Sequence, residues 1–102
     1  MVTEHWNNAE GNPAGGMASG LGFCISWQNG PLGRGEDRKE PNGAFTTTVM
    51  EAVLNRYRYY QSGKFACENN AKVIKLLEEA ISVNESRTKD RNKRGVEGTH
   101  KE

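Results

Sequence analysis

Apolar residues recur with helical spacing through the second half of the chain. Between residues 44 and 61 they stand three or four positions apart, at Phe45, Val49, Val53, Tyr57 and Tyr60, with Met50 and Leu54 widening the face. This is the pattern of an amphipathic helix, which Ser62-Gly63 then interrupts. A second helical pattern covers residues 64–94 and ends at Gly95, with packing residues at Ala66, Asn70, Val73, Ile74, Leu77 and Ile81. Because the break is short, we expect an antiparallel helical hairpin.

The first half of the chain has a different pattern. Residues 1–20 show no hydrophobic period and contain several Gly and Pro breakers, so they predict a flexible N-terminal arm. Over residues 21–28, apolar and small or polar side chains alternate, which predicts a short strand. A turn at residues 29–31 and a charged, glycine-rich loop at 32–43 follow.

The predicted fold is therefore mainly α with a small β element: an N-terminal short strand and glycine-rich loop precede an antiparallel two-helix hairpin. The C-terminal helix of that hairpin overhangs its partner. We expect residues 21–102 to form a single oligomerising ligand-binding domain. It comprises a strand and loop at 21–43, the hairpin at 44–94 and a tail at 95–102.

One face of the second predicted helix changes from apolar to cationic. Alternating steps of three and four residues connect Val73, Leu77, Ala80, Asn84, Arg87, Arg91 and Arg94, with Thr88 alongside. At about 1.5 Å per residue this helix outruns the first by roughly 20 Å, so the first helix leaves the arginines uncovered. Cations are also favoured at any solvated helix C-terminus. The three arginines, however, continue the packing face, which favours contact with an anion or a neighbouring subunit. The planar, forked arginine side chain is suited to binding phosphate.

Composition and charge limit the classes of function that the chain can have. Apolar residues make up 34% of the 102, and nine of the 12 glycines fall within residues 1–43, so the core is thin and oligomerisation is expected. A net charge of +1 argues against a general binder of polyanions. The positive charge is local, with five cations against one aspartate in residues 87–94.

The sequence also predicts a compartment. Cys24 and Cys67 form no CxxC motif, and we expect them to be reduced, buried thiols of a cytosolic protein. No apolar run reaches the roughly 18 residues of a membrane span, and no signal peptide is visible. We therefore expect a soluble, intracellular protein.

Two further segments carry candidate ligand residues. Glycines at 30, 33 and 35 follow Trp27 and Gln28, without the sequence of a P-loop or a Rossmann fingerprint. This segment is either a plain surface turn or a tight loop that holds Trp27, Gln28 and Arg34 near a ligand. The tail at 95–100 either frays or folds back to offer Thr99 and His100.

Aromatic and titratable residues are the remaining candidates for chemistry. Phe45 and Phe65 stand at predicted helix starts, where a ring either packs into a core or interface or stacks on a base. The two histidines are terminal and show no metal-ligand spacing. No set of nucleophile, base and orienting residue is visible, so we predict no catalytic residues, no metal, no cofactor and no enzyme activity.

Several segments together resemble a known family. They are GFCISWQNGP at 22–31, PNGAF at 41–45, YQSGKFAC at 60–67, RTKDR at 87–91 and RGVEGTH at 94–100. The combination, spread over residues 20–100, resembles the phage Thoeris anti-defence sponges, which share a helical hairpin with anti-CBASS sponges. The resemblance implies a phage protein in the host bacterial cytoplasm.

The resemblance further implies sequestration without cleavage. Such proteins bind cyclic nucleotide immune signals such as glycocyclic ADP-ribose, and some also hold cyclic di- or trinucleotides at separate sites. Their helical hairpins assemble into homo-oligomers, from dimers to hexamers, with ligand pockets between subunits. No membrane and no polymeric nucleic acid is expected as a partner.

The matching residues carry expected roles from the family onto this chain. Phe45 and Arg94 are among the residues carried over; a ring and a guanidinium would sandwich the adenine, while Arg87 and Arg91 hold the phosphates. The remaining residues that the resemblance implies in the site are Asn55, Thr88, Thr99 and His100. Two alternatives stay open: a small nucleic-acid-binding protein that uses the cations at 87–94, and a hairpin that binds another protein.

Overall fold

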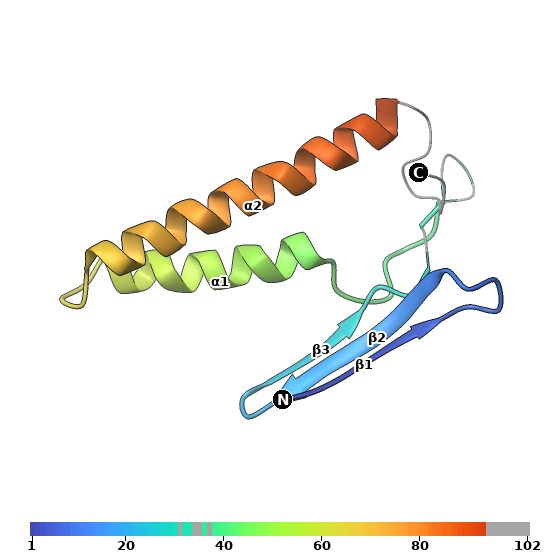
Figure 1. The fold of residues 1–102 in the computed structure, drawn as a ribbon, viewed down its shortest axis with the longest axis horizontal. Coiled ribbons are helices and arrows are strands. Elements are labelled where there is room, and N and C mark those ends of the chain that lie inside the picture. Colours follow the sequence, from blue (N-terminus) through green and yellow to red (C-terminus); the bar gives the residue numbers. More distant parts are fainter. Residues whose placement is uncertain (31, 34–35, 37, 94–102) are drawn as a thin grey trace. The chain divides into compact units, whose positions relative to one another are not determined.

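The computed structural model describes residues 1–30, 32, 33, 36 and 38–93, and for residues 91–93 it describes the backbone alone. The elements in chain order are β1 (Val2–Asn7), β2 (Pro13–Gly20), β3 (Phe23–Trp27), α1 (Thr46–Gln61) and α2 (Glu68–Lys93), as Figure 1 shows. The chain divides into two units by its contacts: a sheet unit that includes Met1–Phe45, and a hairpin unit over Thr46–Asp90. Each unit has its own architecture.

The sheet unit is an antiparallel meander in the order β1-β2-β3. The side chain of Asn8 forms the first turn, because its Oδ1 accepts hydrogen bonds from the backbone N–H groups of Glu10 (2.9 Å) and Asn12 (3.1 Å). Gly22 forms the second turn with φ of 86°, a left-handed conformation that glycine adopts at little cost. The central strand pairs Ala18 with Thr3 on one side and Ile25 on the other.

The flexible arm expected at residues 1–20, and with it the mainly α fold with one short strand, is wrong, because β1 and β2 occupy that segment. Burial in β2 does alternate, but its buried residues are Gly16 and Ala18. Small residues carry no hydrophobic period in sequence. Aromatic rings pack against the small residues of β2, in the space where larger side chains would lie. A Cβ at Gly15, for example, would lie 2.8 Å from Trp6 Nε1.

A strap of three residues, Asn42–Ala44, runs beside β3 and leads toward α1. Trp27 and Ala44 form a parallel bridge, in which the Ala44 N–H donates to the Ser26 carbonyl at 2.7 Å. Gly43 allows this approach, because a Cβ there would lie 2.6 Å from both the carbonyl carbon and the oxygen of Trp27. Backbone atoms cannot move aside as the end of a side chain can.

Gly43→Ala is therefore expected to destabilise the sheet unit by about 1–3 kcal/mol, the usual cost of overpacking. Both tryptophans, Trp6 and Trp27, lie in this unit, so tryptophan fluorescence in a urea titration measures the change. Gly63→Ala is the matched control, since a Cβ there would meet only the Tyr60 carbonyl at 3.8 Å. Equal denaturation midpoints for the two variants would contradict the packing argument.

The hairpin unit consists of α1 and α2, which run in opposite directions from a short turn (Figure 1). Gln61 closes this turn: its Nε2 donates to the Cys67 carbonyl and its Oε1 accepts from the Cys67 N–H, both at 3.0 Å. Cys67 caps α2, because its Sγ accepts from the Asn70 N–H at 3.5 Å. The second helix therefore begins at Glu68, not at Lys64 as its sequence pattern predicts.

The two helices bury few side chains between them. Leu54 of α1 is 5% exposed and Ile81 of α2 is 9% exposed, and Ala18 and Leu32 complete the buried apolar side chains among the described residues. Near the far end of the hairpin, Asn84 Nδ2 donates to Thr47 Oγ1 at 3.4 Å. Since Thr47 lies in the first turn of α1, α2 extends past the start of α1, and its residues after Asn84 run for about 14 Å to Lys93 at 1.5 Å per residue.

Both cysteines are free and exposed, so their expected burial is wrong. Cys24 and its neighbour Ile25 lie on opposite faces of β3, and Cys24 pairs with Ser19 of β2. Cys67 lies at the helix cap described above. Neither position belongs to a core.

Candidate ligand-binding site

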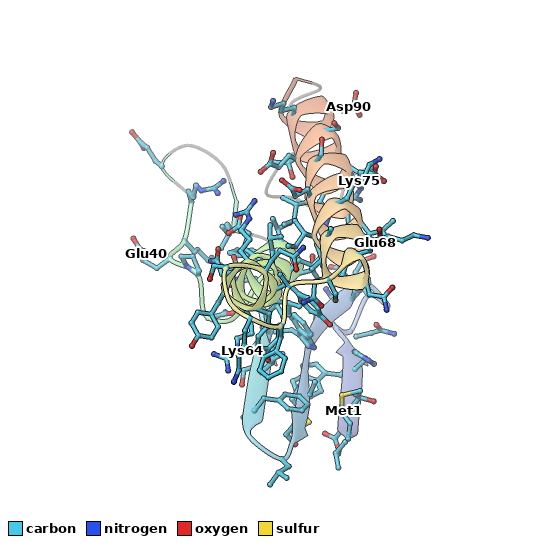
Figure 2. All side chains as sticks on the ribbon, turned by 90° about the vertical axis from the view of Figure 1, so that its left-hand side faces the viewer. Met1, Glu40, Lys64, Glu68, Lys75 and Asp90 are labelled. Atoms are coloured by element: carbon cyan, nitrogen blue, oxygen red, sulfur yellow. The ribbon has the colours of Figure 1, made fainter. Side chains whose placement is uncertain are left out.

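The end of α2 beyond Asn84 carries the cations that the sequence singles out. Arg87, Thr88 and Lys89 are exposed there. The Thr88 hydroxyl donates to the Asn84 carbonyl at 3.1 Å, so it is engaged within its own helix. Arg91 lies within α2 as well, although only its backbone is described. Figure 2 labels Asp90 toward this end and Glu68 at the opposite end.

The phase of these residues differs from the predicted stripe. The residues of α2 that are buried or half-buried are Asn70, Val73, Ile74, Leu77, Ile81 and Asn84, whereas Ala80 is exposed. At 3.6 residues per turn this face continues through Thr88, and Arg87 lies about 90° from its centre. Arg87 instead continues a second stripe through Leu76, Ala80 and Val83. That stripe is exposed, with Leu76 at 52% and Val83 at 68%.

The predicted site residues of the hairpin unit do not form one pocket within a single chain. Phe65 lies in the turn and is 74% exposed. Arg87 lies near the other end of α2, about 29 Å along the helix from Glu68 at 1.5 Å per residue. One ligand of nucleotide size cannot touch both residues of the same chain.

Asn55 lines an open groove of about 400 Å³ between α1 and α2. Among the described residues that line this groove, carboxylates predominate: Glu51, Glu78 and Glu85 lie there with a single cation, Arg58. Arg58 is also paired with Glu78 at 3.3 Å, and both side chains are 52% exposed. Such an exposed pair contributes at most about 1 kcal/mol. The groove alone is therefore a poor anion site.

In the sheet unit, Trp27 is half-buried and Phe45 is 39% exposed. Gln28, a predicted ligand residue, has both ends of its amide engaged within the chain. Its Oε1 accepts from the Asn42 N–H at 2.9 Å, and its Nε2 donates to the Gly30 carbonyl at 3.3 Å. Gln28 thus holds its own loop. Asn42 was not predicted as a site residue, although the Pro-Asn-Gly run that contains it is a signal for a turn.

A cluster on α1 was also missed. The Arg56 guanidinium lies 5.1 Å from the Tyr59 ring centroid and 5.0 Å from that of Tyr60, and its Nε donates to Tyr60 Oη at 3.2 Å. That hydrogen bond, together with attraction between the two groups, raises the pKa of Arg56 above its ordinary value. Cation–π contacts of this kind follow from spacings of three and four on one helix.

Four predicted site residues, Arg34, Arg94, Thr99 and His100, lie outside the described residues. Within the described part of the chain, no group of three or more His, Cys, Asp or Glu side chains is placed to hold a metal ion. Neither described helix is long and apolar enough to cross a membrane.

Comparison with known proteins identifies the family. No protein-family model matches the chain. A protein named Thoeris anti-defense 1, from Bacillus phage SBSphiJ7, is 37% identical to it over 76 residues. The match covers 74% of this chain and 51% of the relative, so the chain spans about half the length of the phage protein. On this similarity, the chain belongs to the Thoeris anti-defence family.

Proposed function

We propose that this chain is a phage sponge that captures a cyclic nucleotide immune signal and holds it intact in the cytoplasm of the host bacterium. Glycocyclic ADP-ribose is the first candidate signal, followed by cyclic di- and trinucleotides. The observation that carries the proposal is the exposed cationic end of α2, where Arg87 and Lys89 lie beyond the start of α1. Membership of the Thoeris anti-defence family further supports a role in opposing the bacterial Thoeris defence.

The chemistry of the proposed capture is anion recognition combined with stacking. Arg87 and Arg91 hold phosphate oxygens through charge-assisted hydrogen bonds. The Phe45 ring stacks on the adenine, and Arg94 covers its other face, because aromatic rings and guanidinium planes both bind the flat face of a base. Thr99 and His100 add polar contacts. The proposal assigns no catalytic step to any of these residues.

Self-assembly is the second part of the proposal, and we expect homo-oligomers between a dimer and a hexamer. The exposed stripe of Leu76, Ala80 and Val83 supports this expectation, because contiguous apolar surface on a small protein marks an interaction site. A neighbouring copy would also supply what one chain lacks, since Phe65 and Arg87 lie at opposite ends of the hairpin.

Val83→Asp is expected to dissociate the assembly, because an unpaired carboxylate would have to be buried at the interface. Sedimentation velocity at a fixed protein concentration gives the readout. Lys75→Asp introduces the same side chain on a different face of α2, where the parent residue is exposed, and should sediment as the parent does. If Val83→Asp also sediments as the parent, the stripe is not the interface.

Calorimetric titration with a glycocyclic ADP-ribose, a cyclic dinucleotide and a cyclic trinucleotide tests the proposed ligand class. Binding of at least one of them at a fixed stoichiometry per subunit supports the proposal. A single-stranded oligonucleotide in the same series tests the nucleic-acid alternative, which the acidic groove and the near-neutral charge disfavour. Absence of binding to all three cyclic nucleotides by a folded oligomer would refute the sponge. The exposed stripe would then favour the hairpin that binds another protein.

A further inference from the structure

An amide latch closes the base of the loop between β3 and α1. The Asn42 side chain makes both hydrogen bonds that the Asn29 backbone can offer to it: its Oδ1 accepts from the Asn29 N–H at 2.8 Å, and its Nδ2 donates to the Asn29 carbonyl at 3.2 Å. The Gln28 side chain in turn binds the Asn42 backbone, because its Oε1 accepts a hydrogen bond from the Asn42 N–H. These reciprocal contacts of Gln28, Asn29 and Asn42 are the amide latch.

The latch continues directly into the backbone pairing of the strap. Two residues after Asn42, the Ala44 N–H donates to the Ser26 carbonyl at 2.7 Å, and the Ala44 carbonyl accepts from the Gln28 N–H at 2.9 Å. Phe45 follows at once. The position of the Phe45 backbone relative to β3 is thus fixed by a short chain of hydrogen bonds that begins at the Asn42 amide.

We propose that Asn42 is a positioning residue for ligand capture, which holds the Phe45 ring at the place where a base stacks on it. This inference rests on the function proposed above. Asn42 itself is exposed, but its amide is turned to Asn29 and is not left for a ligand. Phe45, by contrast, is 39% exposed and presents a ring that the sheet unit does not bury.

The chemistry of the latch requires a carboxamide. Asparagine supplies an acceptor and a donor on one carbon, which match the N–H and the C=O of one backbone residue. Asn42→Asp keeps the acceptor but sets a second oxygen against the Asn29 carbonyl. Asn42→Ala removes both contacts. We therefore expect alanine and aspartate to loosen the strap.

A double-mutant cycle on the oligomeric protein tests whether Asn42 acts through Phe45. The ligand is whichever cyclic nucleotide the parent binds in calorimetry. Asn42→Ala should weaken binding about tenfold, the scale of one or two lost hydrogen bonds. In a Phe45→Ala background it should cause no further loss, because the ring that it positions is gone. Asn69→Ala, an exposed asparagine on α2, is the control and should bind as the parent.

Hydrogen exchange without ligand gives the independent readout. The amides of Gln28 and Ala44 should exchange faster in Asn42→Ala than in the parent, while those of α1 and α2 keep their rates. Unchanged exchange at these two amides would overturn the inference, as would losses that add in the double mutant. Normal ligand binding by Asn42→Ala would overturn it too and leave the sponge standing. A parent that binds no cyclic nucleotide would remove the proposed function, and this inference with it.

Discussion

Replacing Arg87 with alanine should weaken the proposed capture of a cyclic nucleotide by roughly 10- to 100-fold, the value of a lost hydrogen bond between charged groups. Arg87 is exposed on the part of α2 that α1 does not cover. Its removal therefore leaves the fold unchanged, and the whole effect should appear in ligand affinity. Titration calorimetry measures that affinity, and circular dichroism verifies the helices.

Two further variants sharpen the Arg87 prediction. Arg87→Lys keeps the charge but loses the planar fork, so its affinity should fall between those of the parent and Arg87→Ala. Lys75→Ala removes an exposed cation from the same helix, about 18 Å away at 1.5 Å per residue, and should bind as the parent. Equal losses for Lys75→Ala and Arg87→Ala would mean that net charge, not a site, governs binding.

The second large effect is expected at Leu54, the most buried side chain of the hairpin unit. Leu54→Ala should lower the free energy of unfolding of this unit by about 2–3 kcal/mol, the low end for a leucine in a core, because an open groove borders the site and admits water. Leu54 is 5% exposed and lines that groove together with Ile81. A small domain has little stability to lose.

Urea denaturation followed by circular dichroism at 222 nm reports the hairpin, since both helices belong to it. Leu76→Ala is the matched control, because the same deletion at a side chain that is 52% exposed removes little buried surface. At concentrations that keep the protein monomeric, Leu76→Ala should stay within about 0.5 kcal/mol of the parent. A loss at Leu76 as large as that at Leu54 would show that the buried pair does not organise the hairpin.

The helices were predictable because large apolar residues carry their period. Packing residues repeat at helical spacing from Phe45 to Tyr60 and from Asn70 to Ile81. The helices α1 and α2 form over these two segments. The start of α2 was not predictable from that period. A side-chain hydrogen-bond pair, Gln61 with Cys67, decides it.

The sheet was not predictable because its central strand is built of small residues. The sequence PAGGMASG of β2 satisfies every rule for a breaker-rich loop. It forms a strand because rings such as that of Trp6 cover its glycines and because β1 and β3 supply backbone partners. Those contacts are tertiary, and no local pattern contains them.

The candidate site was predictable in part. The sequence located the cationic overhang, and the structure exposes Arg87 there. It did not give the helical phase correctly, because burial of Ile81 rather than Ala80 rotates the packing face away from Arg87. It also could not distinguish a ligand amide from a structural one, and Gln28 belongs to the latch with Asn42. Such distinctions depend on which backbone groups a loop leaves unpaired.

Recovery of the ligand after capture tests the central claim most directly. The purified protein would be mixed with a limiting amount of glycocyclic ADP-ribose, separated from free ligand by gel filtration and denatured by heat. The released molecule would then be identified by mass spectrometry. We expect the protein fraction to remove the ligand from solution and to return it chemically intact in a fixed ratio to subunits. Release of a linear or hydrolysed product, or ligand that stays entirely in the free fraction, would contradict it.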